Sequence, residues 1–232
     1  ESYKRGDIYT GLLKGFEPAE NAIEVLDGGV QSTIQDWPGR IGYWDVGVPP
    51  CGPMDPLSFR IGNKLLENED DAPGLELTLR GGSYYFRNDM WFCITGADME
   101  AMLDEVFVPR YKPIFAMRGQ ILKFGEAKKG MRTYLLVAGG FDMPKILGSS
   151  ATFTLGNFGG HSGRALRIGD VLGIKKGAVP NILKELPEFH RPPLGNIWTI
   201  GIIPGPHCSE EFLEPDYLNE LTETECQVHF NS

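Results

Sequence analysis

The chain of 232 residues is long enough for one large all-β domain or two small ones, and its 41% apolar content supports a folded core. Its formal net charge is −9, from 22 basic and 31 acidic residues, and no basic stripe is present. Because a phosphate backbone attracts clustered Lys and Arg, we expect no nucleic-acid partner. No apolar run reaches the roughly 18 residues that predict a membrane-spanning helix, so we expect no membrane partner either.

The cysteines and histidines are scattered along the chain without the spacing of a zinc site, so we expect no metal. They are Cys51, Cys93, Cys208 and Cys226, and His161, His190, His207 and His229. Scattered thiols without a C-x-x-C pair indicate a reducing compartment, and the first residues have no signal-peptide apolar segment. Together these features predict a cytoplasmic protein.

Residues 1–22 carry little apolar weight and are interpreted as a linker or docking tail. From residue 23 onward, short apolar runs rich in Val, Ile, Tyr, Phe and Thr are broken by glycine. Such runs, spaced by roughly ten residues, predict the strands of an all-β barrel or sandwich. The predicted strands cover residues 23–26, 31–36, 75–79, 83–86, 91–95, 100–103, 120–124, 133–138 and 170–174.

One helix is predicted over residues 54–68, where Asp55 is placed to cap the N-terminus and Pro56 suits the first helical position. From Leu57 onward, apolar residues recur every four positions and form one stripe. The remaining predictions are a short helix at 143–149, an extended connector at 179–196, a strand at 197–203, a helix or turn at 209–221 and a final strand at 226–232.

A first glycine-rich loop covers residues 33–55 and leads into the helix that Asp55 caps. Backbone N–H groups at a sharp turn and at a helix N-terminus can stabilise an anionic oxygen. The alternative is that Asp55 is only a cap and that the aromatic side chains of the loop, Trp37, Tyr43 and Trp44, are only core.

A second glycine-rich loop covers residues 155–170, with glycines on both sides of His161. Glycine has no Cβ, so Gly159 and Gly160 allow close approach of a ligand or of another backbone segment. The alternative is a tight loop packed between strands, with Arg164 pairing a surface acid.

Two residues near these loops are assigned structural roles. Cys51 lies beside the first loop, but no histidine follows at a recognisable triad position, so it is not predicted to be a nucleophile. Glu76 alternates with apolar residues in a predicted strand and is expected to be solvent-facing or locally paired.

Residues 33–63, TIQDWPGRIGYWDVGVPPCGPMDPLSFRIGN, resemble the signature of the allophanate hydrolase subunit 2 or KipA-like family, which runs through T-I-Q-D, G-R-x-G, G-V-P and G-x-M-D. Residues 139–170 resemble a later segment of the same family, and the likeness extends over about residues 23–174. The forms GVPPCGPMD and TFTLGNFGGHSGRALRIGD look closer to the urea carboxylase branch, in which a KipA-like half is followed by a KipI-like half.

The resemblance implies a mainly β fold, a cyclophilin-like β-barrel with few short helices. Residues 23–232 would then be the N-terminal part of a KipA-like carboxyltransferase subdomain, incomplete at its C-terminal end and divided near 175–196. As a fragment it is expected to be inactive alone.

The implied reaction passes a carboxyl group from carboxybiotin to urea, which yields allophanate. Biotin is carried on a separate biotin carboxyl carrier domain, and ATP and Mg are used only on an upstream biotin carboxylase domain. The expected partners are these two domains, the KipI-like second half and the substrate urea.

The resemblance also implies that the two loops border the cleft where carboxybiotin meets urea. The expected catalytic residues are Asp36, Arg40 and Asp55, and the expected binding residues are Gln35, Gly52, Gly159, Gly160 and His161. Three alternatives stay open: a 5-oxoprolinase subunit, a non-catalytic KipA-like regulator, and guanidine in place of urea.

Overall fold

The computed structural model describes residues 21–177, 180, 185–195, 197–209, 211, 212, 214 and 216–227. The chain divides into two compact units, Glu1–Leu194 and Gly195–Ser232. Most of the tail expected at residues 1–22 lies outside the described residues.

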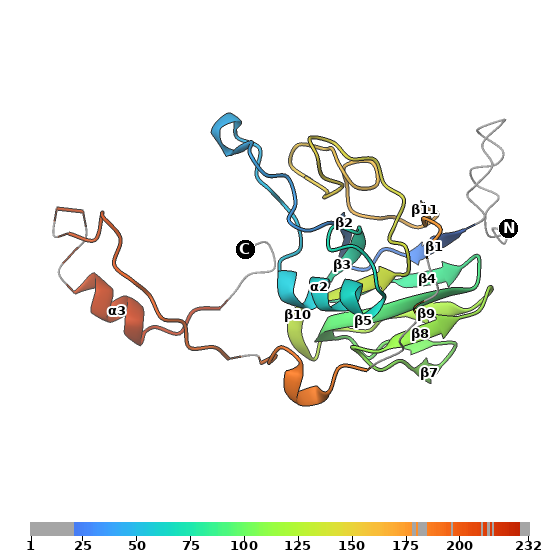
Figure 1. Cartoon of the computed structure of the whole chain (residues 1–232). Helices are drawn as coiled ribbons and strands as arrows, with labels where there is room; N and C mark the ends of the chain where they lie inside the picture. The colour runs from blue at the N-terminus through green and yellow to red at the C-terminus, as the bar shows by residue number, and fades with distance from the viewer. Residues whose placement is uncertain are drawn as a thin grey trace, which may run out of the picture. The chain divides into compact units, whose positions relative to one another are not determined.

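The first unit is built from two antiparallel sheets (Figure 1). One sheet has six strands in the order β11 (Val171–Gly173), β1 (Ala22–Asp27), β4 (Ser83–Phe86), β9 (Ile121–Lys123), β6 (Met102–Leu103) and β7 (Val106–Phe107). The other has five, in the order β2 (Gln31–Gln35), β3 (Gly74–Thr78), β10 (Lys129–Val137), β5 (Met90–Asp98) and β8 (Pro113–Ala116).

The main hydrophobic core combines residues of both sheets. In β10, Leu135 and Val137 join this core, whereas the alternate residues Tyr134 and Leu136 belong to a second cluster with Phe59 of the helix. Successive side chains of a strand point to opposite faces, so one face of the five-stranded sheet packs against the other sheet and the opposite face packs against the helix.

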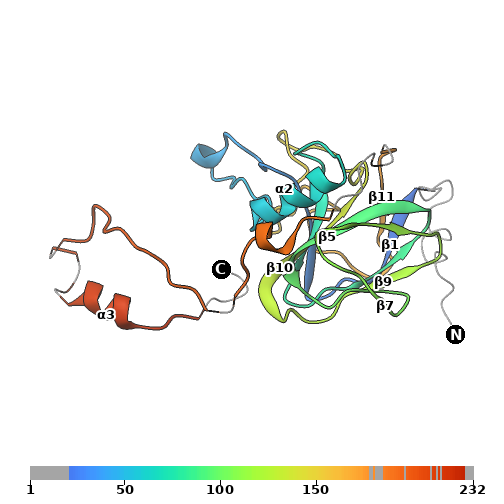
Figure 2. The ribbon, with the colours of Figure 1, turned by 60° about the horizontal axis from the view of Figure 1, so that its bottom comes forward.

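Helix α2 (Pro56–Leu65) lies across the outer face of the five-stranded sheet, over β5 and β10 (Figure 2). Asp55 caps its N-terminus: the carboxylate accepts a hydrogen bond of 2.9 Å from the backbone N–H of Ser58, and Pro56 stands at the first helical position. This is the cap that the sequence predicts.

The mainly β class with few short helices is confirmed, and each of the nine predicted strands has a counterpart. Among the described residues, however, strand pairing forms two open sheets and no closed barrel. Consecutive strands β1 and β2 belong to different sheets, so the short turn between them carries the chain from one layer to the next.

Two local predictions are wrong, and two strands were not predicted. The helix expected at 143–149 is replaced by a turn in which Ile146 and Ser149 exchange backbone hydrogen bonds, and Pro144 and Gly148 both disfavour a helix there. Residues 197–203 form no strand. The unpredicted strands are β7, which has two residues, and β8, an edge strand. β8 begins at Pro113, and the first residue of an edge strand is a position where proline is tolerated.

The second unit contains α3 (Tyr217–Glu223), which overlaps the region 209–221 predicted as helix or turn and extends two residues beyond it. The extended connector contains a 3-10 helix at Glu188–His190. Of the predicted final strand, residues 226 and 227 have no regular structure, and residues 228–232 lie outside the described residues.

Candidate functional site

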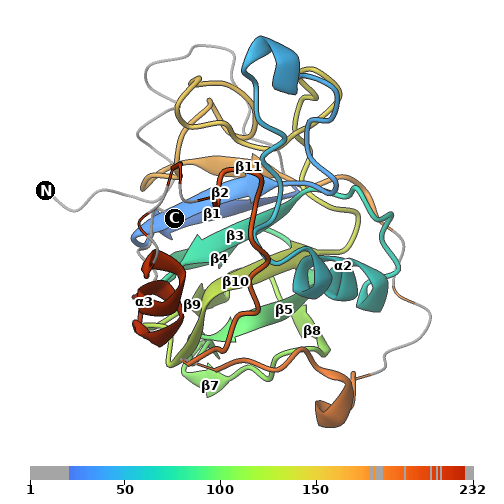
Figure 3. The same cartoon turned by 90° about the vertical axis from the view of Figure 1, so that its left-hand side faces the viewer.

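Two long loops project side by side from the same end of the two sheets (Figures 1 and 3). The first loop, residues 36–55, connects β2 to α2, and the second loop, here residues 143–164, lies between β10 and β11. Residues that are 100 or more positions apart in the sequence meet where the loops touch, as the bond from Arg40 to Ala151 shows with a separation of 111. The fold therefore brings the two glycine-rich loops together.

The base of the first loop is held by acceptor side chains on three adjacent strands. Gln35 of β2 accepts the N–H of Gly52 at 3.0 Å, and Glu76 of β3 accepts the N–H of Met54 at 2.7 Å. Tyr134 of β10 accepts the N–H of Asp55, also at 2.7 Å. These contacts fix the path of the chain into α2. The N–H group of Gly52 is thereby bonded to another protein group.

Glu76 is the charged centre of this row of acceptors. It also accepts a hydrogen bond of 2.8 Å from the Tyr134 hydroxyl, and its second oxygen lies 3.7 Å from Nε of Arg132. Burial raises the pKa of Glu76, an effect that its hydrogen bonds and Arg132 offset only in part. Glu76 is therefore locally paired and not solvent-facing.

Arg40 is fully buried although it lies in a surface loop. Its Nε donates to the carbonyl of Ile146 at 3.0 Å, and its Nη2 donates to the carbonyl of Ala151 at 2.7 Å. The guanidinium also lies 4.8 Å from the ring centroid of Phe158, within the range of a cation–π contact. The Arg40 guanidinium thus binds two carbonyls of the second loop and lies against one of its aromatic rings.

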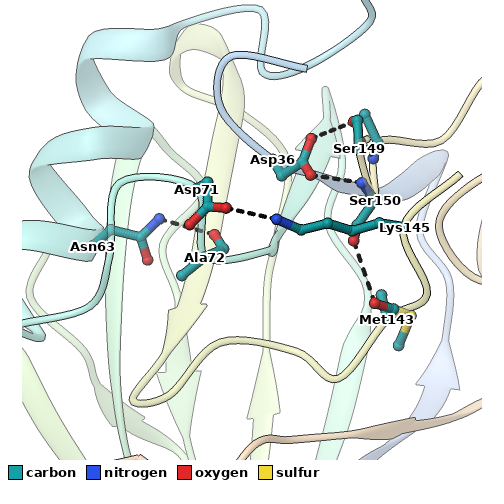
Figure 4. A network of polar contacts seen from close by, with 9 residues as sticks. Asp36, Asn63, Asp71, Ala72, Met143, Lys145, Ser149 and Ser150 are labelled. Carbon is teal, nitrogen blue, oxygen red and sulfur yellow. Dashed lines mark hydrogen bonds and ion pairs between the residues drawn. The ribbon is translucent and has the colours of Figure 1, made fainter. Parts of the chain in front are cut away.

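Asp36 makes a parallel set of contacts (Figure 4). One carboxylate oxygen accepts from the hydroxyl of Ser149 and the other from the backbone N–H of Ser150, each at 2.6 Å. Lys145 instead points to Asp71, at 2.8 Å, and that pair is about half exposed. Both oxygens of Asp36 are therefore used by the second loop.

The glycines of the second loop lie against other protein atoms. A Cβ on Gly159 would meet the carbonyl of Ala151 and would lie 2.9 Å from Nη2 of Arg40, and φ is +75° there. A Cβ on Gly160 would meet the Thr152 side chain, and the Gly160 N–H donates to the carbonyl of Ser150 at 2.8 Å. The missing side chains make room for the protein's own backbone and side chains.

His161 and Arg164 share one buried partner, Asp170. Arg164 binds both carboxylate oxygens, at 2.7 and 2.8 Å, and Nε2 of His161 lies 3.3 Å from one of them. Burial alone would raise the pKa of Asp170, but hydrogen bonds from Arg164, His161 and the Arg167 N–H together hold that pKa well below its usual range. The partner of Arg164 is thus a buried acid and not a surface one.

Cys51 is half-buried beside the charged residues of the first loop. Burial raises the pKa of its thiol, and the nearby Arg40 opposes that rise only in part. At neutral pH the thiol therefore keeps its proton, which agrees with its exclusion as a nucleophile.

The site residues expected from the sequence separate into three groups. Asp36, Arg40, Gly159 and Gly160 lie where the loops meet, Gln35, Gly52 and Asp55 lie at the base of the first loop, and His161 lies beside Asp170. Sequence reasoning missed Glu76, Tyr134, Ser149 and Ser150. The sequence held a signal for Glu76 alone: a glutamate that alternates with apolar residues in a strand and could accept from a loop rich in backbone donors.

The outer parts of both loops expose apolar side chains. The largest exposed fractions are 71% for Trp44 in the first loop and 88% for Leu155 in the second. Trp44 is therefore not a core residue. Within the described residues, no three His, Cys, Asp or Glu side chains gather closely enough to hold a metal ion, and none of the helices described is long and apolar enough to cross a membrane.

A family model described as carboxyltransferase domain, subdomain A and B, matches residues 46–232. The urea amidolyase of Saccharomyces cerevisiae is 39% identical over 236 residues, which cover 99% of this chain and 13% of that protein. The crystal structure of Kluyveromyces lactis urea amidolyase matches with a TM-score of 0.85 at 36% identity, over 96% of this chain and 14% of that one.

A 5-oxoprolinase subunit from Haemophilus influenzae is 44% identical over 156 residues, which cover 65% of this chain and 48% of that protein. The chain thus spans 13% of the yeast urea amidolyase and about half of the 5-oxoprolinase protein. The likeness to urea amidolyase runs over nearly the whole chain, whereas the likeness to 5-oxoprolinase covers two thirds of it.

Proposed function

Because the chain belongs to the carboxyltransferase domain family, subdomain A and B, we propose that it forms part of the carboxyltransferase of a biotin-dependent urea carboxylase. The proposed reaction transfers a carboxyl group from carboxybiotin to a urea nitrogen and gives allophanate. The observation that carries this proposal is the likeness to yeast urea amidolyase over 99% of the chain.

A 5-oxoprolinase subunit is the second candidate, and the higher identity of 44% over 156 residues favours it locally. Against it, that likeness covers only 65% of this chain. The remaining third resembles urea amidolyase, which favours the urea reaction. A non-catalytic KipA-like regulator would require a stable complex with a KipI-like protein that does not depend on biotin.

We place the reaction at the end of the fold where the first and second loops meet. Segment 146–160 carries no charged side chain and includes the 88% exposed Leu155, and Trp44 of the first loop is 71% exposed. Such a surface suits the apolar thioether ring and hydrocarbon chain of biotin, which supplies the activated carboxyl group when bound.

The chain's own residues would orient the reactants there. Asp55 and His161 lie in the loops that border the proposed site and are the candidates to bind urea N–H groups or a carboxylate. Gly52 and Gly160 give their N–H groups to Gln35 and Ser150, so in this arrangement they would shape the site instead of donating to the substrate. Urea is a poor nucleophile, and holding it close to the carboxyl donor lowers the activation barrier, because the entropy lost in bringing the two together is lost on binding and not in the reaction step.

The proposal includes partners and cofactors outside this chain. Biotin would arrive on a biotin carboxyl carrier domain, and ATP and Mg would act on a biotin carboxylase domain. A KipI-like half would complete the carboxyltransferase, and the chain alone would be inactive. The described cysteines are all free thiols, which supports a cytoplasmic location.

A substrate comparison with the complete enzyme tests the proposal. With ATP, bicarbonate and the carrier present, we expect carboxylation of urea, and the same preparation given guanidine decides between those two substrates. ATP-dependent cleavage of 5-oxoproline without any carboxylation of urea or guanidine would overturn the proposal. The isolated chain, given free carboxybiotin, should transfer no carboxyl group to urea.

A further inference from the structure

Asp36 and Arg40 bind the same short stretch of the second loop from the first loop. Arg40 binds the carbonyls of Ile146 and Ala151, and Asp36 binds Ser149 and Ser150 between them. Four hydrogen bonds therefore fall within residues 146–151, and each involves a charged group. Charge-assisted hydrogen bonds are roughly twice as strong as neutral ones.

Neither side chain is accessible to a substrate in this arrangement. Asp36 is 2% exposed and both of its oxygens are engaged, and Arg40 is 0% exposed. A ligand could reach them only if the second loop moved away. The burial that removes them from solvent also makes their contacts with the second loop costly to lose, because a buried charge without a partner is unfavourable.

The surroundings are shaped to hold this arrangement. Gly159 leaves room for the Arg40 guanidinium, and the ring of Phe158 lies beside that group. The turn at Ile146 directs its carbonyl to Arg40, a second reason, beside Pro144 and Gly148, why residues 143–149 do not form the expected helix. In a helix, that carbonyl would instead accept from the residue four positions later.

We propose that Asp36 and Arg40 are positioning residues that fasten the second loop to the first loop and hold the carboxyltransferase site in its working geometry. The effect on catalysis rests on the proposed function, whereas the fastening itself does not. Neither residue touches substrate. Misplacement of reacting groups by about 1 Å can cost on the order of 100-fold in rate, so loosening the second loop should reduce turnover.

The test uses Asp36→Asn, Arg40→Lys and the double variant in the complete enzyme. Asn keeps one acceptor oxygen and Lys keeps the charge, so both are mild changes. The matched controls are Asp27→Asn and Arg80→Lys, a 2.9 Å ion pair on the first unit whose side chains are 46% and 42% exposed. Ser149→Ala is a further variant, which removes one donor to Asp36 and leaves both charges in place.

The first measurement is backbone hydrogen exchange of peptides that cover residues 143–164. We expect faster exchange there in both single variants and in Ser149→Ala, and no change in the controls. Unchanged exchange in the single variants would overturn the proposal. This measurement needs no substrate, so faster exchange in an enzyme that does not carboxylate urea would contradict the proposed function and not the fastening.

The second measurement is steady-state carboxylation of urea. We expect kcat to fall about 10- to 100-fold in each single variant while KM for urea changes less than about threefold. The double variant should be no more than about threefold worse than the poorer single variant, because either change already frees the second loop. A large rise in KM with multiplying losses would identify Asp36 and Arg40 as substrate-binding groups and overturn the proposal.

Discussion

The hydroxyl of Tyr134 donates to Glu76 at 2.8 Å and at the same time accepts the backbone N–H of Asp55 at 2.7 Å. One side chain thus links a buried carboxylate on the neighbouring strand to the residue that caps α2. The register of β3 and β10 places Tyr134 directly opposite Glu76. The five-stranded sheet therefore fixes the end of the first loop through side chains and not only through backbone pairing.

Tyr134→Phe should destabilise the fold by about 1–3 kcal/mol, because the N–H of Asp55 and an oxygen of Glu76 would each lose a partner in a buried setting. Denaturant unfolding of the chain measures this free energy. Tyr217→Phe, in the second unit where the side chain is 46% exposed, is the control and should change it by less than about 0.5 kcal/mol. Equal effects of the two changes would contradict the role of Tyr134.

Glu76→Gln should make the stability depend less on pH. Burial holds the folded-state pKa of Glu76 above the ordinary value of 4.5, so its contribution to stability is fully present below pH 4.5 and is lost as the pH rises through the folded-state pKa. The stability of the glutamine variant relative to the native chain should therefore increase from about pH 4.5 upward and then level off. Unfolding free energies at a series of pH values give this curve, and a flat difference would contradict it.

Asp170→Asn should destabilise the chain by about 1.5–3 kcal/mol at neutral pH, because Arg164, whose side chain is 27% exposed, would lose its bidentate charge-assisted partner. The pKa of Asp170 is held below its ordinary 3.8, so its contribution is present above that pH and is lost as the pH falls toward the folded-state pKa. The difference in unfolding free energy between native and variant should thus narrow in acid. Asp27→Asn is the control. The Asp27 side chain is 46% exposed, so this change should lower the unfolding free energy much less.

Gly159→Ala should be more harmful than Gly148→Ala, although both glycines have a positive φ, +75° and +82°. A Cβ at Gly148 has nothing within 4 Å, whereas one at Gly159 would meet the carbonyl of Ala151, which Arg40 also binds. The comparison separates the contact from the strain of the backbone conformation. Thermal unfolding of the two variants is the measurement, and equal losses would show that only φ matters.

Much of the fold could be predicted from the sequence because it depends on local patterns. Alternation and glycine spacing located nine strands, and Asp55 with Pro56 located the start of α2. Two-residue β7 has too little sequence to form a pattern, and β8 is an edge strand of only four residues. Pro144 and Gly148 argue locally against a helix at 143–149, but the contact of the Ile146 carbonyl with Arg40, 106 positions away, has no local pattern.

The candidate site was less predictable for the same reason. The glycine-rich loops were identified, but their charged residues were expected to face substrate because the family resemblance implied that the loops border the reaction cleft. The burial of Asp36 and Arg40 depends on partners 106–114 positions away in the chain. Glu76 and Tyr134 likewise meet only because β3 pairs with β10.

A Trp44→Ala variant of the complete enzyme tests the placement of the carboxyltransferase site most directly. Its two half-reactions, carboxylation of biotin and transfer to urea, are measured separately. Trp44 is 71% exposed at the outer part of the first loop, so its loss should leave folding intact, and Phe189→Ala, at a side chain 81% exposed, is the control. We predict that carboxylation of biotin is unchanged in both variants and that transfer to urea falls at least about tenfold in Trp44→Ala alone. Native rates of transfer in Trp44→Ala would contradict a reaction site that includes the exposed outer part of the first loop.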